Sequence, residues 1–318
     1  MATIKHLRIV FMGTPHFAVG IFKALLQAGH NIVAVVTAPD RPAGRGRKMN
    51  ASAVKEFALE NDVPVLQPTN LKDPMFLGDL RALEADLQVV VAFRMLPKVV
   101  WQMPAKGTFN LHASLLPQYR GAAPINWAIM NGETKTGVTT FFIDDKIDTG
   151  AIILKKETEI GPEDTAGSLH DHLMELGARA VLETVDLIGR DKALPRPQVV
   201  QEPLREAPKL NKEICRLDFE RSLKALYDFI RGLSPYPAAW CTLHNGEEAA
   251  MLKVFKVRPE VARHDHPSGT LLSGKKELKV AVRDGFLNIM ELQLQGKRKM
   301  KVTDFLNGHK LLENAYVS

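Results

Sequence analysis

An asparagine and a histidine stand two residues apart in FNLHASLLPQYRGAAPI, residues 109–125. Side chains two apart on a β-strand project from the same face, so Asn110 and His112 are expected to point the same way. A lone histidine on an apolar strand usually has a structural role, but a neighbouring amide adds a second group that needs hydrogen-bond partners. The pair therefore indicates a polar site, with an amide as donor and an imidazole as acid or base.

Carboxylates follow in FFIDDKIDTGAIIL, where Asp144, Asp145 and Asp148 lie in an expected loop between two strands. Gly150 permits a tight return of the chain. An aspartate in such a loop can reach a histidine on a neighbouring strand and set its tautomer and charge. The Asp-Thr-Gly turn thus favours a functional role for the histidine over a structural one.

Two turns bear on the kind of ligand that the protein binds. The apolar SLLP turn after His112 is suited to form one wall of a pocket for a flat aromatic ligand. The turn in FMGTPHFA, residues 11–18, holds a lone glycine and lacks the G-x-G-x-x-G pattern of dinucleotide sites. It is better explained as a tight strand-to-helix turn at the edge of a ligand crevice.

The first half of the chain alternates β-branched runs with helical patterns. Expected strands span residues 7–12, 31–37, 87–93, 108–113, 136–143 and 151–157, and expected helices span 50–61, 74–84 and 164–188. Thr165 or Asp164 is a suitable N-cap for the last helix. The alternation predicts an α/β fold with a doubly wound, mostly parallel sheet, which places His112 at a strand's carboxyl end, where ligands bind.

The pattern breaks near residue 189, where a stretch with four prolines and no period begins. We expect a linker over 189–208 between a catalytic domain of residues 1–188 and a second domain of residues 209–318. In the latter, a helical stretch at 220–232 precedes short apolar runs with Gly and Asn-Gly turn signals, and a last helix is expected at 303–312. This pattern favours a small β-barrel or sandwich.

The composition is that of a folded globular protein, with 318 residues, 45% hydrophobic and 25% charged. Cys215 and Cys241 cannot form a disulfide framework and lack histidines at metal-ligand spacing. No secretory signal is expected at the N-terminus, and no run reaches the roughly 18–20 apolar residues of a membrane span. The sequence therefore predicts a soluble cytoplasmic protein.

The net charge of +6 is unevenly distributed. Residues 1–208 hold 23 Lys/Arg and 23 Asp/Glu, whereas residues 209–318 hold 19 and 13, so 19 − 13 = +6. Such asymmetry suggests an anionic partner, nucleic acid or a membrane surface, with a merely solvated basic face as the alternative.

Two basic segments are candidates for contact with RNA phosphates. DRPAGRGRK places Arg41, Arg45, Arg47 and Lys48 in an expected Gly-rich loop, and KRKMK at 297–301 is supported by Lys275, Lys276 and Lys279. Closely spaced cations on flexible backbone suit phosphate contacts and make affinity salt-dependent. A small barrel is also a fold that often binds nucleic acid.

Five segments together resemble the methionyl-tRNA formyltransferase family: FMGTPHFA, TAPDRPAGRGRK, FNLHASLLPQYRGAAPINWAI, DDKIDTG and SPYPAAW. The resemblance covers nearly the whole chain, and N-x-H, S-L-L-P and D-T-G in this order are specific for 10-formyltetrahydrofolate formyltransferases. It implies a Rossmann-like catalytic domain followed by an OB-like barrel. It also implies 10-formyltetrahydrofolate as cosubstrate and initiator methionyl-tRNA as acceptor. We expect no metal and no membrane partner, and a monomer.

Residue by residue, the resemblance implies three roles. Asn110, His112 and Asp148 correspond to the catalytic trio of the family, and Ser114, Leu115, Leu116 and Pro117 to its folate-contacting turn. The 41–48 loop corresponds to the loop that the family uses on the acceptor stem of tRNA. One departure is visible, because Phe93-Arg94-Met95 replaces a Tyr-Gly-containing stretch and is one residue shorter, beside the expected folate pocket.

Other functions stay open at this point. Formyltransferases acting on glycinamide ribonucleotide or an amino-sugar nucleotide share the trio, but they do not need the basic loop or a basic barrel. A hydrolase releasing formate from the same folate would need no amine acceptor. A tRNA-binding module with an inactive α/β domain, or a nicotinamide-dependent oxidoreductase, would show no folate turnover.

Overall fold

The computed structural model describes residues 7–43, 48–200 and 203–318. The chain forms two compact units. The first unit comprises residues 1–121, 136–158 and 170–206, and the second comprises 122–135, 159–169 and 207–318. Two short stretches, residues 122–135 and 159–169, thus belong with the C-terminal part. The domain boundaries expected at 188 and 209 remain a prediction.

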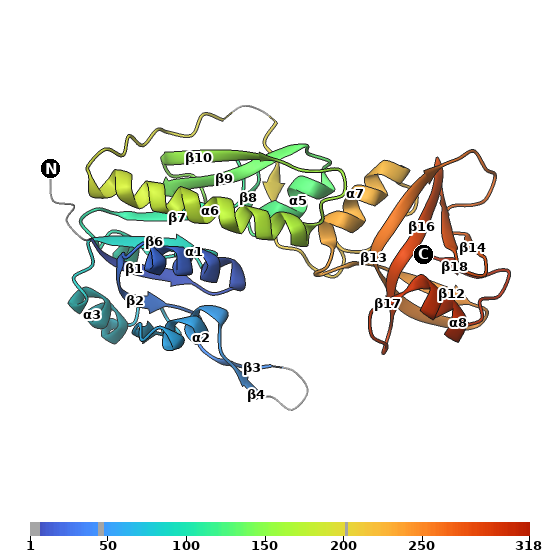
Figure 1. Ribbon diagram of the computed structural model, residues 1–318, viewed down its shortest axis with the longest axis horizontal. Helices are drawn as coiled ribbons and strands as arrows, with labels where there is room; N and C mark the ends of the chain where they lie inside the picture. The colour runs from blue at the N-terminus through green and yellow to red at the C-terminus, as the bar shows by residue number, and fades with distance from the viewer. Residues whose placement is uncertain (1–6, 44–47, 201–202) are drawn as a thin grey trace. The chain divides into compact units, whose positions relative to one another are not determined.

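The first unit is built on a seven-stranded sheet with the order β10-β9-β7-β6-β1-β2-β5 (Figure 1). Its strands are β1 (Arg8–Gly13), β2 (Asn31–Val36), β5 (Val65–Leu66), β6 (Leu87–Val91), β7 (Thr108–His112), β9 (Lys135–Phe142) and β10 (Ile152–Glu159). Pairing is parallel from β2 through β1 and β6 to β7, and antiparallel between β7 and β9. The predicted mostly parallel sheet is confirmed, with antiparallel strands at one edge.

Helices cover both faces of this sheet, which makes it doubly wound. They are α1 (His16–Gln27), α2 (Ala53–Glu60), α3 (Pro74–Ala82), α4 (Lys98–Trp101) and α6 (Ala166–Gly189). On one face, where Figure 1 shows α1 and α6, Phe11 of β1 stacks on Phe22 of α1 with ring centroids 5.2 Å apart. On the other face, Met12 packs in a cluster with Phe76 and Leu80 of α3. Alternate residues of β1 thus bury against opposite helical layers.

The helix starts follow their sequence signals. The hydroxyl of Ser52 accepts from the Lys55 amide at 3.1 Å and caps α2. Asp73, followed by Pro74, caps α3 by accepting from the Met75 amide at 2.8 Å. Thr165 caps α6, since its hydroxyl accepts from the Ser168 amide at 3.1 Å, so this predicted N-cap is confirmed.

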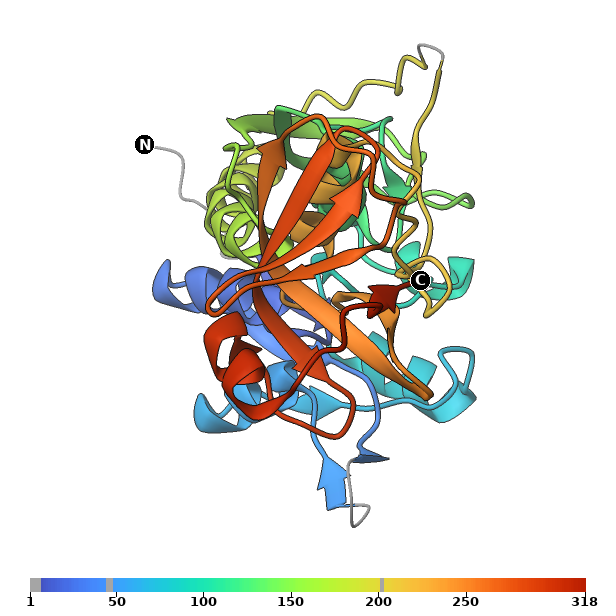
Figure 2. The ribbon, with the colours of Figure 1, turned by 90° about the vertical axis from the view of Figure 1, so that its right-hand side faces the viewer.

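The second unit contains an antiparallel sheet that curls round on itself (Figure 2). Its strands lie in the order β14-β15-β16-β13-β12-β18, and β17 pairs with β16. Their bounds are β12 (Ala239–Asn245), β13 (Glu248–Val261), β14 (Leu271–Ser273), β15 (Leu278–Val282), β16 (Gly285–Leu294), β17 (Met300–Lys301) and β18 (Tyr316–Val317). A bridge between Thr270 and Tyr316 joins the two ends of this order. The sheet is therefore a nearly closed, OB-like barrel, as expected.

Helices α5 (Pro124–Met130), α7 (Leu223–Leu233) and α8 (Val302–Gly308) complete the second unit. Leu226 and Ile230 of α7 are buried in the core of the barrel. Cys215 and Cys241 are both buried and free. Burial raises the pKa of the Cys241 thiol to about 12, so this residue is an inert core side chain.

Some short elements differ from the expectation. The basic segment expected to be a loop begins and ends in an antiparallel pair, β3 (Arg41–Ala43) and β4 (Lys48–Asn50). The two-residue strands β8 (Arg120–Gly121) and β11 (Glu206–Ala207) and helix α5 have no clear sequence period, because such short elements hold too few residues to show one. Helix α8 ends at Gly308 rather than at residue 312.

Candidate active site

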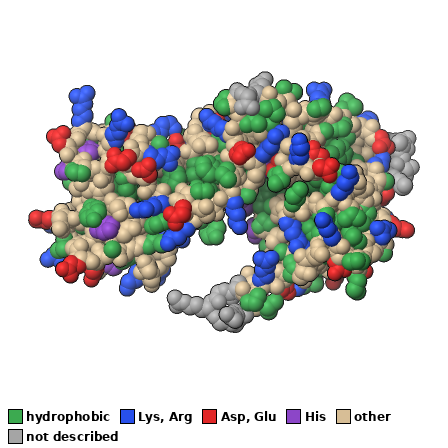
Figure 3. Space-filling view, turned by 180° about the vertical axis from the view of Figure 1, so that it is seen from behind, with side chains coloured by type: hydrophobic (Ala, Val, Ile, Leu, Met, Phe, Trp, Pro, Cys, Tyr) green, Lys and Arg blue, Asp and Glu red, His purple; other side chains and the backbone are tan. Residues whose placement is uncertain are grey.

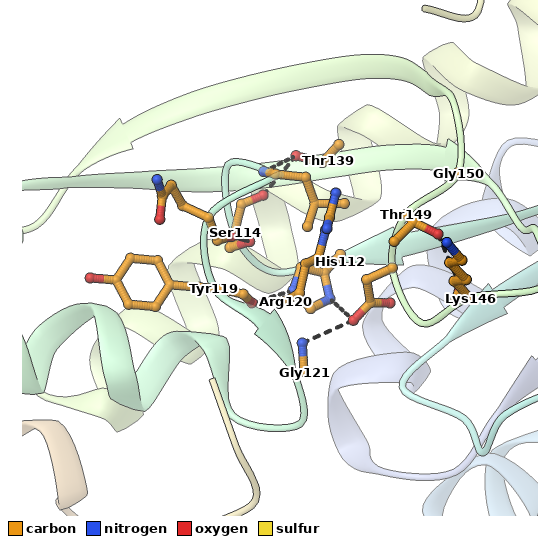
Figure 4. Close-up of polar contacts among 12 residues, drawn as sticks. His112, Ser114, Tyr119, Arg120, Gly121, Thr139, Lys146, Thr149 and Gly150 are labelled. Atoms are coloured by element: carbon orange, nitrogen blue, oxygen red, sulfur yellow. Dashed lines mark hydrogen bonds and ion pairs between the residues drawn. The ribbon is translucent and has the colours of Figure 1, made fainter. Parts of the chain in front are cut away.

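His112 is the last residue of β7, at the edge where β1, β6 and β7 all end. Its side chain is 6% exposed. The Nε2 atom lies 2.7 Å from the backbone oxygen of Tyr119, and because a carbonyl only accepts, Nε2 carries a proton. The Nδ1 atom faces Oδ2 of Asp148 at 3.7 Å, beyond direct hydrogen-bond distance. Figure 4 shows His112 close to Tyr119 and Gly121.

Asp148 is the only one of the three loop carboxylates that faces His112. Asp144 instead accepts from the Thr149 hydroxyl at 2.7 Å and from the Lys146 amide at 3.0 Å, which ties the loop together. Asp145 is exposed and lies 4.0 Å from Lys98. The carboxylate of Asp148 also accepts from the Gly121 amide at 3.0 Å (Figure 4). The Asp148 carboxylate is thus held between the His112 imidazole and the Gly121 amide.

The turn that carries Asp148 is tightly constrained. Asp148 itself has a φ of 54°, in the left-handed region. A Cβ on Gly150 would lie 1.7 Å from the backbone oxygen of Phe142, so only glycine fits there. The Asp-Thr-Gly sequence is thus explained by backbone geometry as well as by chemistry.

Asn110 lies two residues before His112 on β7, on the same face of the sheet. Its side chain is half-buried, and among the residues that the structure describes it has no hydrogen-bond partner. A half-buried amide without a partner at a ligand-binding strand end is a donor available to a bound molecule.

The SLLP turn, residues 114–117, contains two buried side chains and two that are partly exposed to a ligand. Ser114 is buried and donates to the Gln118 carbonyl at 2.7 Å, and Leu116 is fully buried. The buried hydroxyl of Thr139 donates to the Ser114 carbonyl at 2.7 Å, while the Leu116 amide donates to the same hydroxyl at 3.2 Å. Only Leu115 and Pro117 have partly exposed side chains. A ligand on this turn therefore meets these two side chains or the backbone.

The loop after β6, which contains Phe93-Arg94-Met95, is anchored by Arg94. Its guanidinium donates to the backbone oxygens of Pro68 and Thr69 and lies 5.6 Å from the centre of the Phe93 ring. Burial lowers the pKa of Arg94, and the nearby charge of Arg41 lowers it further. Arg94 is thus committed to holding two loops together.

The expected RNA-contacting segment is only partly described. Arg41 is exposed on β3, and the backbone of Lys48 lies in β4, whereas Arg45 and Arg47 lie outside the described residues. Asp40 precedes the segment and bonds Lys55 at 2.5 Å and Gln67 at 2.8 Å. These hydrogen bonds lower the pKa of Asp40, so the base of the segment is fixed by an ionised carboxylate.

The basic residues of the barrel are partly neutralised. Lys279 pairs with Glu260 at 2.8 Å, and Lys299 pairs with Glu291 at 2.5 Å. Lys275 and Lys276 are exposed. In Figure 3, Lys and Arg side chains of this unit alternate with acidic ones. Lys279 and Lys299 are therefore less available to an anionic partner than their sequence positions suggest.

Neither a metal site nor a membrane span was expected from the sequence. No group of three or more His, Cys, Asp or Glu side chains in the described ranges is arranged to hold a metal ion. Within the same ranges, no helix is long and apolar enough to cross a membrane.

Sequence reasoning missed the groups that hold His112, the Asp148 turn and the SLLP turn in place. They are the Tyr119 carbonyl, the Gly121 amide, the Thr139 hydroxyl and the Gln198 amide. Two of these are backbone groups, which carry no sequence signature. Gln198 lies in the expected linker, where composition gives no reason to single it out.

Family comparisons agree with this fold. A profile described as "Formyl transferase" matches residues 7–185, and one described as "Formyl transferase, C-terminal domain" matches residues 209–310. The class that the fold and site define is thus formyltransferase.

Curated relatives give the particular family. The chain is 54% identical over 314 residues to the methionyl-tRNA formyltransferase of Flavobacterium johnsoniae, covering 99% of this chain and 100% of the relative. It is 54% identical to that of Bacteroides thetaiotaomicron, covering 96% and 97%. The chain belongs to the methionyl-tRNA formyltransferase family.

Solved structures share the fold at lower identity. The sugar 3N-formyl transferase WlaRD has a TM-score of 0.63 at 19% identity, covering 92% of this chain and 100% of that chain. HypX from Aquifex aeolicus, solved with tetrahydrofolic acid, has a TM-score of 0.65 at 19% identity over 95% of this chain. This chain spans 47% of HypX, about half its length.

Proposed function

We propose that this protein transfers the formyl group of 10-formyltetrahydrofolate to the α-amine of methionine on initiator methionyl-tRNA, for translation initiation. The observation that carries the proposal is the full-length identity of 54% to proteins named methionyl-tRNA formyltransferase. The His112–Asp148 pair at the strand edge supplies a matching chemical centre. The enzyme works as a cytoplasmic monomer, with residues 1–188 as catalytic domain and 209–318 as tRNA-binding domain.

The folate cosubstrate is expected at the edge where β1, β6 and β7 end. Support comes from the formyl transferase profiles and from the neighbour HypX, solved with tetrahydrofolic acid. The SLLP turn, with Leu115 and Pro117 partly exposed, offers an apolar wall for the flat pterin. Ser114 and Leu116 hold the turn in shape rather than touching the ligand through their side chains.

The reaction exchanges one acyl–nitrogen bond for another and needs no metal. The neutral amine of methionine attacks the formyl carbon, and a tetrahedral intermediate forms with negative charge on the formyl oxygen. The bond to N10 then breaks, N10 gains a proton and the amine nitrogen loses one. The protein must therefore stabilise an oxyanion and move one proton.

The geometry supports a division of these two tasks. The unpartnered amide of Asn110 is the donor for the formyl oxygen. His112 donates its Nε2 proton to the Tyr119 carbonyl and faces Asp148 with Nδ1, which leaves the Asp148 carboxylate as the group that moves the proton. Protonated His112 also adds positive charge beside the oxyanion. Asp148 stabilises this charge and relays the proton from the amine to N10.

The tRNA is expected to contact the basic segment with Arg41, Arg45, Arg47 and Lys48. Arg41 is exposed at its base, and Asp40 anchors the chain beside it through Lys55. Phosphate contacts of this kind make affinity salt-dependent. The barrel, with exposed Lys275 and Lys276, is the second contact.

The test is formyl transfer from 10-formyltetrahydrofolate with two acceptors compared side by side. We expect turnover with charged initiator tRNA and none with glycinamide ribonucleotide. Activity only on the ribonucleotide, or formate release without any acceptor, would overturn the proposal.

A further inference from the structure

Residues 190–200 and 203–206, which belong to the linker expected over 189–208, run back along the loops of the candidate active site. We call them the return segment. Within residues 194–200 every side chain is exposed except that of Gln198, which is half-buried. An inward glutamine in an otherwise exposed stretch indicates a specific contact.

The amide nitrogen of Gln198 binds both sides of the catalytic turn. It donates to the backbone oxygen of Asp148 at 2.9 Å and to that of Gly150 at 3.0 Å. These two carbonyls flank Thr149, so the contact fixes the turn that aims the Asp148 carboxylate. The left-handed φ of 54° at Asp148 is a conformation that persists when surrounding contacts hold it.

The amide oxygen of Gln198 binds the loop on the other side of His112. It accepts from Arg120 at 2.6 Å through Nη2 and at 3.3 Å through Nε. The residue before Arg120 gives the carbonyl that binds His112, and the residue after it gives the amide that binds Asp148. One glutamine thus joins the two loops that hold the His112–Asp148 pair.

The orientation of this amide is fixed by its partners. Backbone carbonyls only accept and a guanidinium only donates, so the nitrogen must face the turn and the oxygen must face Arg120. Neither aspartate, glutamate nor alanine meets both demands at this position.

We propose that Gln198 is a positioning residue for the His112–Asp148 pair, acting by locking the Asp148 turn to the Arg120 loop. The inference rests on the proposed formyl transfer. It predicts that loss of Gln198 lowers the rate of the chemical step and leaves substrate binding unchanged, because the Gln198 amide is already bonded to the two loops on both its nitrogen and its oxygen.

The return segment is held independently of this glutamine. Arg196 exchanges two backbone hydrogen bonds with Ile152, at 2.9 and 2.8 Å, and the Arg205 carbonyl accepts from the Tyr119 amide at 2.6 Å. Substitution of Gln198 should therefore leave the path of the segment intact, and the variants should fold.

The first experiment compares Gln198→Ala and Gln198→Glu with Val199→Ala, an exposed neighbour. Misplacement of a reacting group by about 1 Å costs on the order of 10²-fold in rate, so we expect kcat to fall about 10- to 100-fold in both Gln198 variants with KM for folate and tRNA unchanged. Val199→Ala should match the wild type. Glutamate keeps the Arg120 contact but repels the two carbonyls, so wild-type kcat in Gln198→Glu would overturn the proposal.

The second experiment asks whether Gln198 acts through Asp148. In an Asp148→Asn background, measured by single turnover with excess enzyme, adding Gln198→Ala should change the rate by less than about twofold, because coupled residues are not additive. A further fall as large as in the wild-type background would overturn the proposal. If wild-type protein transferred no formyl group to tRNA, the proposed function would fail instead.

Discussion

Two pairs of ionisable side chains in this protein are built in opposite ways. In the second unit, Arg231 donates to Asp228 at 2.8 Å and to the Asp164 carbonyl at 2.8 Å, while Lys224 binds the other carboxylate oxygen at 2.6 Å. At the candidate active site, His112 and Asp148 are 3.7 Å apart, and nearby Asn110 has no partner among the described residues.

The difference separates a structural pair from a chemical one. A buried charge with saturated contacts stabilises one arrangement and offers nothing to a ligand. A pair whose two side chains are beyond direct hydrogen-bond distance, and which lies beside a side-chain N–H donor without a partner, can change its protonation and bind an incoming group. We therefore assign stability to Asp228 and catalysis to His112.

The largest expected effect is on the structural pair. Asp228→Asn leaves Arg231 buried without its carboxylate, and we expect the free energy of unfolding to fall by about 3–5 kcal/mol. Urea-induced unfolding measures this. Lys224→Met, which removes the exposed partner of the same carboxylate, is the matched control and should cost less than about 1 kcal/mol. Equal destabilisation in Asp228→Asn and Lys224→Met would show that the buried Asp228–Arg231 pair has no special role in stability.

The next effect is on the chemical site. Asn110→Ala removes the proposed oxyanion donor, so kcat should fall about 10²–10³-fold. The melting temperature should stay near the wild-type value, since no hydrogen bond to a described residue is removed. Asn110→Asp keeps the shape without the donor and should be equally impaired; activity in that variant would show that the N–H is not needed.

Charge reversal in the basic segment tests the tRNA contact. Replacing Arg41, Arg45 and Arg47 by Glu should raise KM for tRNA and leave KM for folate unchanged. Removal of each cation that pairs with a phosphate should reduce the salt slope of tRNA binding by roughly 0.7–0.9. Lys23→Glu, an exposed site on α1, serves as control. Equally weakened use of folate and tRNA would count against the segment as an RNA-binding element.

The smallest effect concerns the ion pair of the barrel. Hydrogen bonds from Lys279 and Asn288 lower the pKa of Glu260, so the pair adds stability above the ordinary glutamate pKa of about 4.3. That stability disappears as pH falls through the lowered value. The melting temperatures of wild type and Glu260→Gln should therefore converge between pH 7 and pH 3. A constant difference would show that ionisation of Glu260 does not contribute.

Much of the fold follows from sequence because its signals are local. Strand periodicity predicts that Asn110 and His112 share a face, and the Asp-Thr-Gly turn predicts a carboxylate nearby. Caps such as Thr165 act within one helical turn, so their prediction needs no tertiary information.

The rest depends on groups brought together over long sequence distances. Gly121 reaches Asp148 across 27 residues, and Gln198 reaches it across 50. Proline content indicates that the return segment is irregular, but irregular backbone can pack anywhere. The choice among Asp144, Asp145 and Asp148 likewise required the geometry of the loop.

The most direct measurement of the central claim is formyl transfer to charged initiator tRNA by His112→Ala, with its melting temperature recorded on the same sample. We expect turnover to fall by at least about 10²-fold while the melting temperature stays close to that of the wild type. Near-normal turnover in a folded His112→Ala protein would contradict the catalytic role of His112.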